Sequence, residues 1–337
     1  MATNYNFTDY GAMRPTARTW IKHTLLLVVT FCTATIAGSL FPFGNLTPAF
    51  LNAAPETWGQ TLEFIATLPI QYLGFLSAAV GELLTNRNYL IDGLSFSLSL
   101  LFILLSHEMG HYVACRLYRV DATLPYFIPT PPMIGPAGTF GAFIKIMSPL
   151  PSRRATFDIG VAGPIAGFIA MIPIAVIGVA TMKPVPANFV AQPGSLIFSD
   201  PPLLKLIGAA FGTNPEFGFG NPYYYAAWVG CLVTALNLIP SGQLDGGHAI
   251  YAVLGKVVHH WTGRAAFVAM AILSVIGWFV YGSPSGFLIA ILLGVMLRIK
   301  HPEPYDQTPL DTKRLAIALA TLLIFIFCFT PFPIRFT

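Results

Sequence analysis

Charged side chains are scarce in this sequence, and their scarcity limits the kind of protein that it encodes. Asp, Glu, Lys and Arg make up 9% of the 337 residues, whereas hydrophobic residues make up 55%, and the mean hydropathy is +0.68. A soluble domain carries about 25% charged residues, which it needs to cover its surface. The sequence therefore fits a soluble globule, a disordered chain or a nucleic-acid-binding protein poorly. It predicts a chain solvated largely by lipid.

Cysteine is also scarce. The four cysteines are Cys32, Cys115, Cys231 and Cys328, and all of them fall inside apolar runs without forming a C-x-x-C pair. This pattern argues against a disulfide framework and against a thiolate metal site. The four side chains are expected to be small buried thiols.

Long apolar runs are abundant, and seven of them reach or approach the 20 or so residues that a membrane span needs. The predicted spans are 22–41, 93–117, 157–181, 222–240, 264–282, 285–299 and 314–331. The predicted fold class is therefore an all-α polytopic membrane protein with about seven transmembrane helices. The chain 1–337 is expected to form a single integral membrane domain, with an N-terminal span at 22–41 and C-terminal spans over 264–331.

An eighth apolar stretch, 61–83, is interrupted by polar side chains, and the distribution of basic residues indicates how it lies. Lys and Arg concentrate on cytoplasmic loops. If the N-terminus is inside and 61–83 does not cross, 14 of the 18 basic residues, from Arg14 to Arg314, lie on the inner side. The four on the outer side are Arg87, Lys183, Lys205 and Arg335. We expect a cytoplasmic N-terminus and a surface segment at 61–83, with a re-entrant or spanning segment as the alternatives.

The clearest chemical signal is His107-Glu108-x-x-His111, an H-E-x-x-H motif at the end of an apolar run. On a helix the two imidazoles share one face and can bind one zinc ion, while the adjacent glutamate can reach a metal-bound water. Ionisable residues inside a span are costly and are usually functional. The motif predicts one Zn²⁺ per chain, bound by His107 and His111, with Glu108 as the catalytic base. A polar helix end at the interface is the simpler alternative.

A catalytic zinc site takes three protein ligands, so a third is required. Among the acidic residues after His111, Asp200 and Glu216 fall on the predicted outer side. Asp245 lies at the inner end of a span, where Pro240 should end a helix and three nearby glycines let the backbone fold closely. Asp245 is therefore the predicted third ligand. The alternative is an ordinary loop aspartate that caps the next helix.

At this point the sequence resembles a known family. HEMGH at 107–111 and NLIPSGQLDGGH at 237–248 are similar to the two signatures of the site-2 protease family of intramembrane zinc metalloproteases. Residues 125–146 resemble the membrane-associated β-hairpin of that family, and 157–167 resemble a Gly-Pro stretch on its middle core helix. The segment 182–221 is too short for the PDZ domain of the better-known bacterial members, so the resemblance is to the short, PDZ-less branch.

The resemblance implies a three-helix catalytic core over 90–265 that holds zinc through His107, His111 and Asp245, with Glu108 as general base and acid. Further candidate substrate or oxyanion contacts are Asn237 and His248 near the predicted site, and Gly138, Thr139, Phe140 and Gly141 in the strand-like segment 138–146, whose open edge an unwound peptide could join as a strand. Each of these has a simpler interpretation. Asn237 can form a helix–helix hydrogen bond or cap a local bend, His248 can be an interfacial histidine, and the segment 138–146 can be a simple cytoplasmic loop or hairpin.

The predicted function is zinc-dependent hydrolysis of peptide bonds within the transmembrane segments of membrane proteins, which together with the lipid bilayer are the predicted partners. The alternatives are a divalent-metal transporter and a catalytically inactive homologue that binds membrane helices. Because no Arg- and Ser-rich transit segment is visible, a bacterial cytoplasmic membrane is expected, with the active site open to the cytoplasm. The sequence does not specify an oligomeric state.

Overall fold

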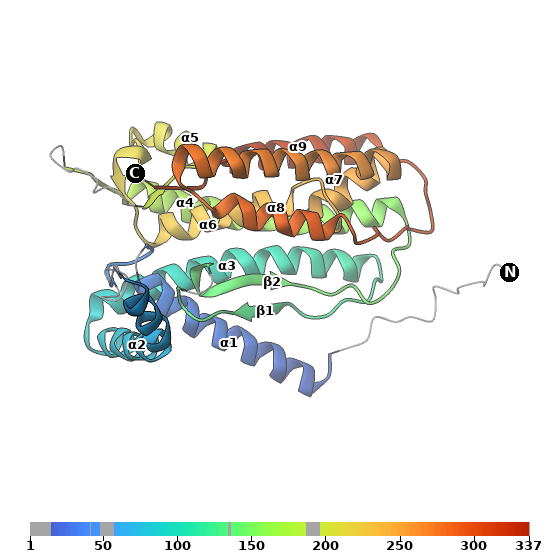
Figure 1. The fold of residues 1–337 in the computed structure, drawn as a ribbon. Coiled ribbons are helices and arrows are strands. Elements are labelled where there is room, and N and C mark those ends of the chain that lie inside the picture. Colours follow the sequence, from blue (N-terminus) through green and yellow to red (C-terminus); the bar gives the residue numbers. More distant parts are fainter. Residues whose placement is uncertain (1–14, 41, 48–56, 134–135, 187–195, 337) are drawn as a thin grey trace.

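The computed structural model describes residues 15–40, 42–47, 57–133, 136–186 and 196–336 (Figure 1). Most of the described chain is helical. The helices are α1 (Ala17–Ser39), α2 (Trp58–Thr85), α3 (Arg87–Leu117), α4 (Arg153–Ala180), α5 (Pro202–Phe211), α6 (Pro222–Asn237), α7 (Asp245–Tyr281), α8 (Ser285–Met296) and α9 (Thr312–Cys328). Among the described residues, α1, α2, α3, α4 and α7 are long and apolar enough to cross a membrane. The predicted all-α polytopic membrane fold is confirmed, while the exact number of spans stays a prediction.

Side-chain caps define where several of these helices begin. Ser152 accepts a hydrogen bond from Ala155 at the start of α4, and Asp311 does the same for Arg314 at the start of α9. Asn221 caps α6, whose first residue is Pro222. Such caps satisfy backbone N–H groups that have no partner within the helix. They fix the entry points of three helices that surround the site.

Among the residues that the structure describes, the strands are short and form three separate two-stranded pairs. β1 (Tyr126–Pro129) and β2 (Thr139–Phe143) make an antiparallel hairpin with Tyr126 opposite Phe143, which confirms the β-hairpin predicted within 125–146. In the other two pairs, β3 (Lys183–Pro184) pairs with β5 (Gly218–Phe219), and β4 (Leu196–Phe198) pairs with β6 (Ile334–Phe336). The hairpin lies between α1 and α3, with β2 on the α3 side (Figure 1).

The main core lies where α3, α4 and α6 pack against one another. Phe96, Leu100 and Ile103 of α3, Met171 of α4 and Cys231 of α6 are almost fully buried there. Between transmembrane helices small residues allow close packing. Gly110 of α3 shows this, because a Cβ atom at that position would lie 2.4 Å from the Ala162 carbonyl oxygen.

The helix α2 contains the stretch 61–83 and differs from the others in direction. In Figure 1 it is seen nearly end-on, whereas α3, α4, α7 and α9 run along the length of the molecule. It lies at the end that also holds α5 and the C-terminus. The helix α2 is long and apolar enough to span a membrane, but only 6% of its most apolar 18-residue window is buried inside the protein. This crosswise direction favours the predicted surface segment over a spanning one.

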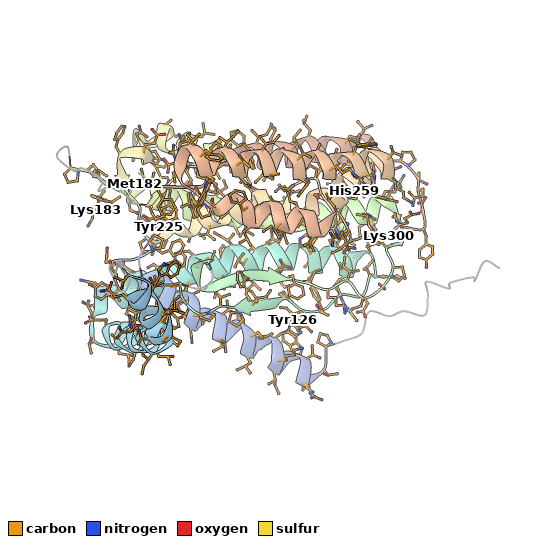
Figure 2. All side chains as sticks on the ribbon, in the orientation of Figure 1. Tyr126, Met182, Lys183, Tyr225, His259 and Lys300 are labelled. Atoms are coloured by element: carbon orange, nitrogen blue, oxygen red, sulfur yellow. The ribbon has the colours of Figure 1, made fainter. Side chains whose placement is uncertain are left out.

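The two ends of the molecule carry the residues that the charge distribution assigns to opposite sides. Lys183, predicted outside, lies at one end beside Met182, and Lys300, predicted inside, lies at the other end near His259 (Figure 2). Arg14, one of the predicted inner residues, falls outside the described residues. The separation is consistent with the two predicted sides, and the choice of which end faces the cytoplasm stays a prediction.

Candidate metal centre and active site

The H-E-x-x-H motif lies in the second half of α3, where His107 and His111 are one turn apart and buried. Their ring centroids are 4.9 Å apart and their Nε2 atoms are 3.2 Å apart. Two imidazoles that turn the same nitrogen toward one point are arranged for a shared cation. The two histidines therefore lie on one face of α3, as their i, i+4 spacing predicts.

Asp245 reaches the same point from a distant part of the chain. The helix α6 ends at Asn237, a tight turn follows, and Asp245 is the first residue of α7. Its Oδ2 lies 3.2 Å from His107 Nε2 and 3.3 Å from His111 Nε2. Asp245 follows Leu244, the N-cap residue of α7, and its carboxylate faces the two histidines.

The turn between α6 and α7 depends on its glycines. Gly242 has a φ of 55°, in the left-handed region that favours glycine. A Cβ atom on Gly246 would lie 2.1 Å from the Leu238 carbonyl oxygen, so the chain can fold back on α6 only with glycine there. The close turn is what brings Asp245 to the level of the two histidines.

Helix α4 makes room for the imidazoles through a row of glycines. A Cβ atom at Gly163 would lie 2.1 Å from His111 Nε2, and one at Gly167 would lie 3.1 Å from His107 Cβ. The same helix orients one ring, because the Nδ1 atom of His111 lies 2.7 Å from the Ile159 carbonyl oxygen and must donate to it. The lone pair of His111 then points from Nε2 toward the site.

The donor set fits zinc. His107, His111 and Asp245 each offer one ligand atom, and these atoms all lie within 4.8 Å of one another. Two imidazole nitrogens with one carboxylate oxygen are a usual ligand set for catalytic zinc, which leaves a position for water. Zinc is therefore the cofactor that these residues can hold.

Glu108 lies beside this group without belonging to it. Its side chain is 5% exposed, and the backbone amide of Ile144, just after β2, faces its carboxyl group. A cavity of about 580 Å³ opens onto Glu108, the three candidate ligands, Asn237 and His248. Glu108 therefore lies at the cavity beside the three candidate ligands.

The other predicted contacts divide into two groups. Asn237 and His248 line the cavity, and Asn237 Nδ2 lies 3.2 Å from His107 Nε2, so its amide faces the site rather than a neighbouring helix. The segment Gly138–Gly141 does not line the cavity among the described residues. Gly138 is held away from it, because its carbonyl oxygen accepts a hydrogen bond from Thr33 of α1 at 2.7 Å.

The part of the hairpin that lines the cavity is Ala142–Ile146 instead. Thr139 is buried and bonds within the hairpin, whereas Phe140 is 62% exposed on its surface. The strand reaches the site only toward its C-terminal end and beyond. Only the later part of the predicted segment 138–146 therefore lines the cavity, and a substrate contact by this segment stays a prediction.

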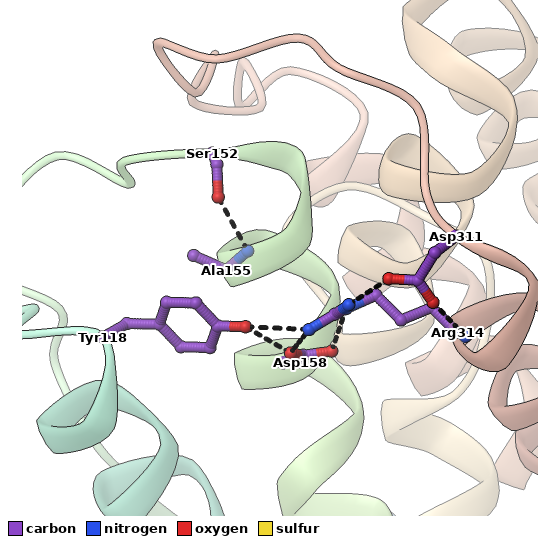
Figure 3. Close-up of polar contacts among 6 residues, drawn as sticks. All are labelled: Tyr118, Ser152, Ala155, Asp158, Asp311 and Arg314. Atoms are coloured by element: carbon purple, nitrogen blue, oxygen red, sulfur yellow. Dashed lines mark hydrogen bonds and ion pairs between the residues drawn. The ribbon is translucent and has the colours of Figure 1, made fainter.

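Two basic residues that sequence analysis did not select support the site from outside the cavity. Gly255 interrupts α7 with a φ of 84°, so a short helix that begins at Asp245 ends there. Arg153 binds the Ala252 carbonyl oxygen at that end through Nε at 3.0 Å and Nη2 at 2.7 Å. Arg314 of α9 forms the second contact, a hydrogen bond from its Nε to Oδ1 of Asp158 in α4 at 2.9 Å (Figure 3). Neither pairing has a signal in the local sequence, because the partners are far apart along the chain.

A bundle of apolar helices that brings two buried histidines, an aspartate and an adjacent glutamate to one cavity is the arrangement of a membrane metalloprotein. The comparison with known proteins gives the family. The sequence model of peptidase family M50 matches residues 95–280, more than half of the chain, and this protein belongs to that family, the site-2 protease family.

Several curated relatives are named as probable zinc metalloproteases of chloroplasts. The chain is 30% identical over 253 residues to probable zinc metalloprotease EGY1 of Arabidopsis thaliana, which covers 71% of this chain and 43% of that protein. It is 27% identical over 293 residues to probable zinc metalloprotease EGY2 of Oryza sativa subsp. indica, covering 85% and 52%. The chain thus spans about half the length of these relatives. No solved structure matches.

Proposed function

We propose that this protein is a zinc-dependent endopeptidase that cleaves peptide bonds within membrane-spanning segments. The observation that carries the proposal is the meeting of His107, His111 and Asp245 with Glu108 around one cavity inside a bundle of apolar helices. Zinc bound there would lower the pKa of a water molecule and polarise the scissile carbonyl. Membrane-protein segments are the proposed substrates and the lipid bilayer is the proposed environment.

The side chains of this site then have distinct roles. Glu108 takes the proton of the attacking water and passes it to the leaving amine. Asn237, whose amide nitrogen faces the ligand group, donates a hydrogen bond to the developing oxyanion or to the substrate backbone. His111 keeps its metal-binding tautomer because its Nδ1–H donates to Ile159.

A helical substrate must unwind before its amide can be attacked, because helical hydrogen bonds hide its backbone. The stretch Ala142–Ile146 can receive the unwound peptide. Within the described parts of the chain β2 pairs with β1 alone, and the stretch lines the cavity beside Glu108. An extended peptide that adds to this edge as a further strand would be fixed by backbone hydrogen bonds next to the metal position.

A metal transporter requires a second set of polar groups along a path through the membrane. Among the residues that the structure describes, His107, His111 and Asp245 are the one group of three metal-ligating side chains that are close together. The core between α3, α4 and α6 beyond them is apolar. An inactive homologue is opposed by the presence of Glu108 at the cavity. Neither alternative is favoured by a specific contact.

The proposal keeps the orientation that the basic residues predict, with the cavity open toward the cytoplasmic side of the membrane. The proposed location is a bacterial cytoplasmic membrane, although the named relatives are chloroplastic. A bacterial and a chloroplast location would both put the protein in a membrane, with one catalytic zinc site per chain.

The test is proteolysis by purified protein in proteoliposomes that contain a single-span substrate. Wild type is expected to cleave the substrate, a zinc chelator is expected to stop cleavage, and added zinc is expected to restore it. Asp245→Ala is expected to lose zinc and activity together. Zinc flux across the vesicle without peptide cleavage would reject the protease and support a transporter.

A further inference from the structure

A cluster of imidazoles adjoins the cavity on the side of the loop between α8 and α9. His248 lies one turn after Asp245, and its Nδ1 atom is 2.8 Å from the Nε2 atom of His301 in that loop. The His301 ring stacks on Tyr251 with centroids 4.2 Å apart and planes 8° apart, and it contacts His259 edge-on at 4.9 Å. His259 and Lys300, next to His301, lie at the same end of the molecule in Figure 2.

The loop that carries His301 is fixed on both sides. Gln243 of the α6–α7 turn donates to the Lys300 carbonyl oxygen at 2.9 Å. Farther along, the backbone amide of Arg153 donates to the Asp306 carbonyl oxygen at 2.9 Å. His301 is therefore a positioned side chain, and it lies beyond the segment 95–280 that the family has in common.

The hydrogen bonds determine which nitrogen of each ring carries a proton. His301 Nδ1 lies 2.8 Å from the Pro302 carbonyl oxygen, which can only accept, so Nδ1 carries the hydrogen. Burial and the neighbouring His248 and His259 lower the pKa of His301 to about 3, which keeps this ring neutral. Its Nε2 atom is then an acceptor, and the Nδ1–H of His248 donates to it.

This arrangement leaves Nε2 as the free polar atom of His248. Among the described residues no donor or acceptor is paired with it, and His248 lines the cavity that also contains Glu108 and Asp245. A neutral His248 with a proton on Nδ1 has its lone pair on Nε2. The position is suited to accept a hydrogen bond from the backbone N–H of a peptide in the cavity.

We infer that His301 is a positioning residue that holds His248 as a hydrogen-bond acceptor for the substrate backbone. The inference rests on the proposed function, since it assumes a peptide in the cavity. His301 does not touch the peptide itself. It acts by fixing the tautomer and the rotamer of His248, and the loss of one hydrogen bond that is fixed in this way weakens binding about tenfold.

The test measures binding rather than turnover, in a Glu108→Gln background that leaves bound peptide intact. The probe is a fluorescent synthetic peptide with a Leu- and Ala-rich spanning segment interrupted by one Gly-Pro pair. We expect His301→Ala to raise its Kd about tenfold, and His301→Gln, whose side-chain oxygen replaces the acceptor, to stay within about twofold. His260→Ala, an exposed histidine outside the cavity, is the matched control and should leave the Kd unchanged.

A double-mutant cycle separates positioning from a general structural effect. In a His248→Ala background, His301→Ala should have no further effect on the Kd, and zinc content should be equal in all variants. Additive effects of the two substitutions, unchanged binding in His301→Ala, or failure of His301→Gln to restore binding would each overturn the inference. Cleavage by wild type together with any of these results leaves the proposed function standing. Absence of cleavage by zinc-loaded wild type rejects both.

Discussion

Arg314 of α9 and Asp158 of α4 are joined by two parallel hydrogen bonds, from Nε to Oδ1 at 2.9 Å and from Nη2 to Oδ2 at 2.6 Å (Figure 3). Tyr118, at the end of α3, also donates to Asp158, and Asp311 receives a bond from Arg314. The cluster ties α3, α4 and α9 together at one end of the bundle. It connects a helix outside the family match with the two helices that frame the metal position.

The bidentate geometry predicts that Arg314→Lys destabilises the protein although it keeps the charge. A lysine offers a single point contact where the guanidinium offers a planar pair of donors, so about 1 kcal/mol should be lost. The thermal midpoint in detergent is expected to fall by about 3 °C, with zinc content unchanged. Lys313→Ala, at the exposed neighbouring position, is the control and should leave the midpoint within error. An equal shift in both variants would contradict the assigned role of the pair.

The glycine row of α4 predicts a loss of metal in Gly163→Ala. A methyl group there would lie 2.1 Å from His111 Nε2, so the ring must leave the metal position or α4 must shift. Zinc per chain is expected to fall to a small fraction of the wild-type value, while helix content by circular dichroism stays the same. Gly74→Ala in α2, where a Cβ atom meets nothing within 4 Å, is the matched control. Full zinc occupancy in Gly163→Ala would disprove the packing argument.

Arg153 is predicted to stabilise the short helix that begins at Asp245. Its guanidinium binds the Ala252 carbonyl oxygen at the end of that helix. Arg153→Ala should therefore make the position of Asp245, the proposed third ligand, less fixed, although Arg153 does not contact Asp245 directly. We expect zinc affinity to fall about tenfold, in the range seen when residues behind metal ligands are removed. The measurement is competition with a chelator of known affinity. Arg154→Ala, one residue along and exposed, should bind zinc as wild type does, and a similar loss in both would refute the specific contact.

The direction of α2 predicts which residues share a side of the membrane. If α2 does not cross, Ala17 and Lys300 lie on one side and Asn88 on the other. Single cysteines at these positions, in a background with the exposed Cys32 replaced by serine, can be labelled with an impermeant maleimide in oriented vesicles. Labelling of Ala17→Cys and Asn88→Cys from the same side would mean that α2 spans the membrane.

The meeting of His107, His111 and Asp245 could be predicted because the signals for it are local. The i, i+4 spacing of His107 and His111 determines a shared helix face, and the Pro-Gly-rich turn before Asp245 marks a close chain reversal. The hairpin was predicted within 125–146 from its strand-like composition and the family resemblance, and it forms there. Which part of it faces the cavity was not visible, because that depends on contacts with other helices, such as the hydrogen bond from Thr33 of α1 to the Gly138 carbonyl oxygen.

What the sequence did not reveal depends on partners far along the chain. In the sequence, His301 is only a histidine in a loop after a predicted span. In the structure its ring stacks on Tyr251 and lies next to His248. Arg153 and Arg314 count as two of many basic residues on the inner side, and only the folded chain shows that each binds a specific carbonyl or carboxylate. Periodicity and composition report neighbours within a few turns, so these contacts leave no local pattern.

The most direct test of the central claim is to map the peptide bond that is cut, using wild type and Glu108→Gln with equal zinc content. A single-span substrate is reconstituted with each protein, and the products are identified by mass spectrometry. Wild type is expected to cut within the spanning segment, whereas Glu108→Gln, with its metal retained, is expected to leave the substrate intact. Equal cleavage by the two proteins, or a cut confined to the soluble flanks of the substrate, would contradict it.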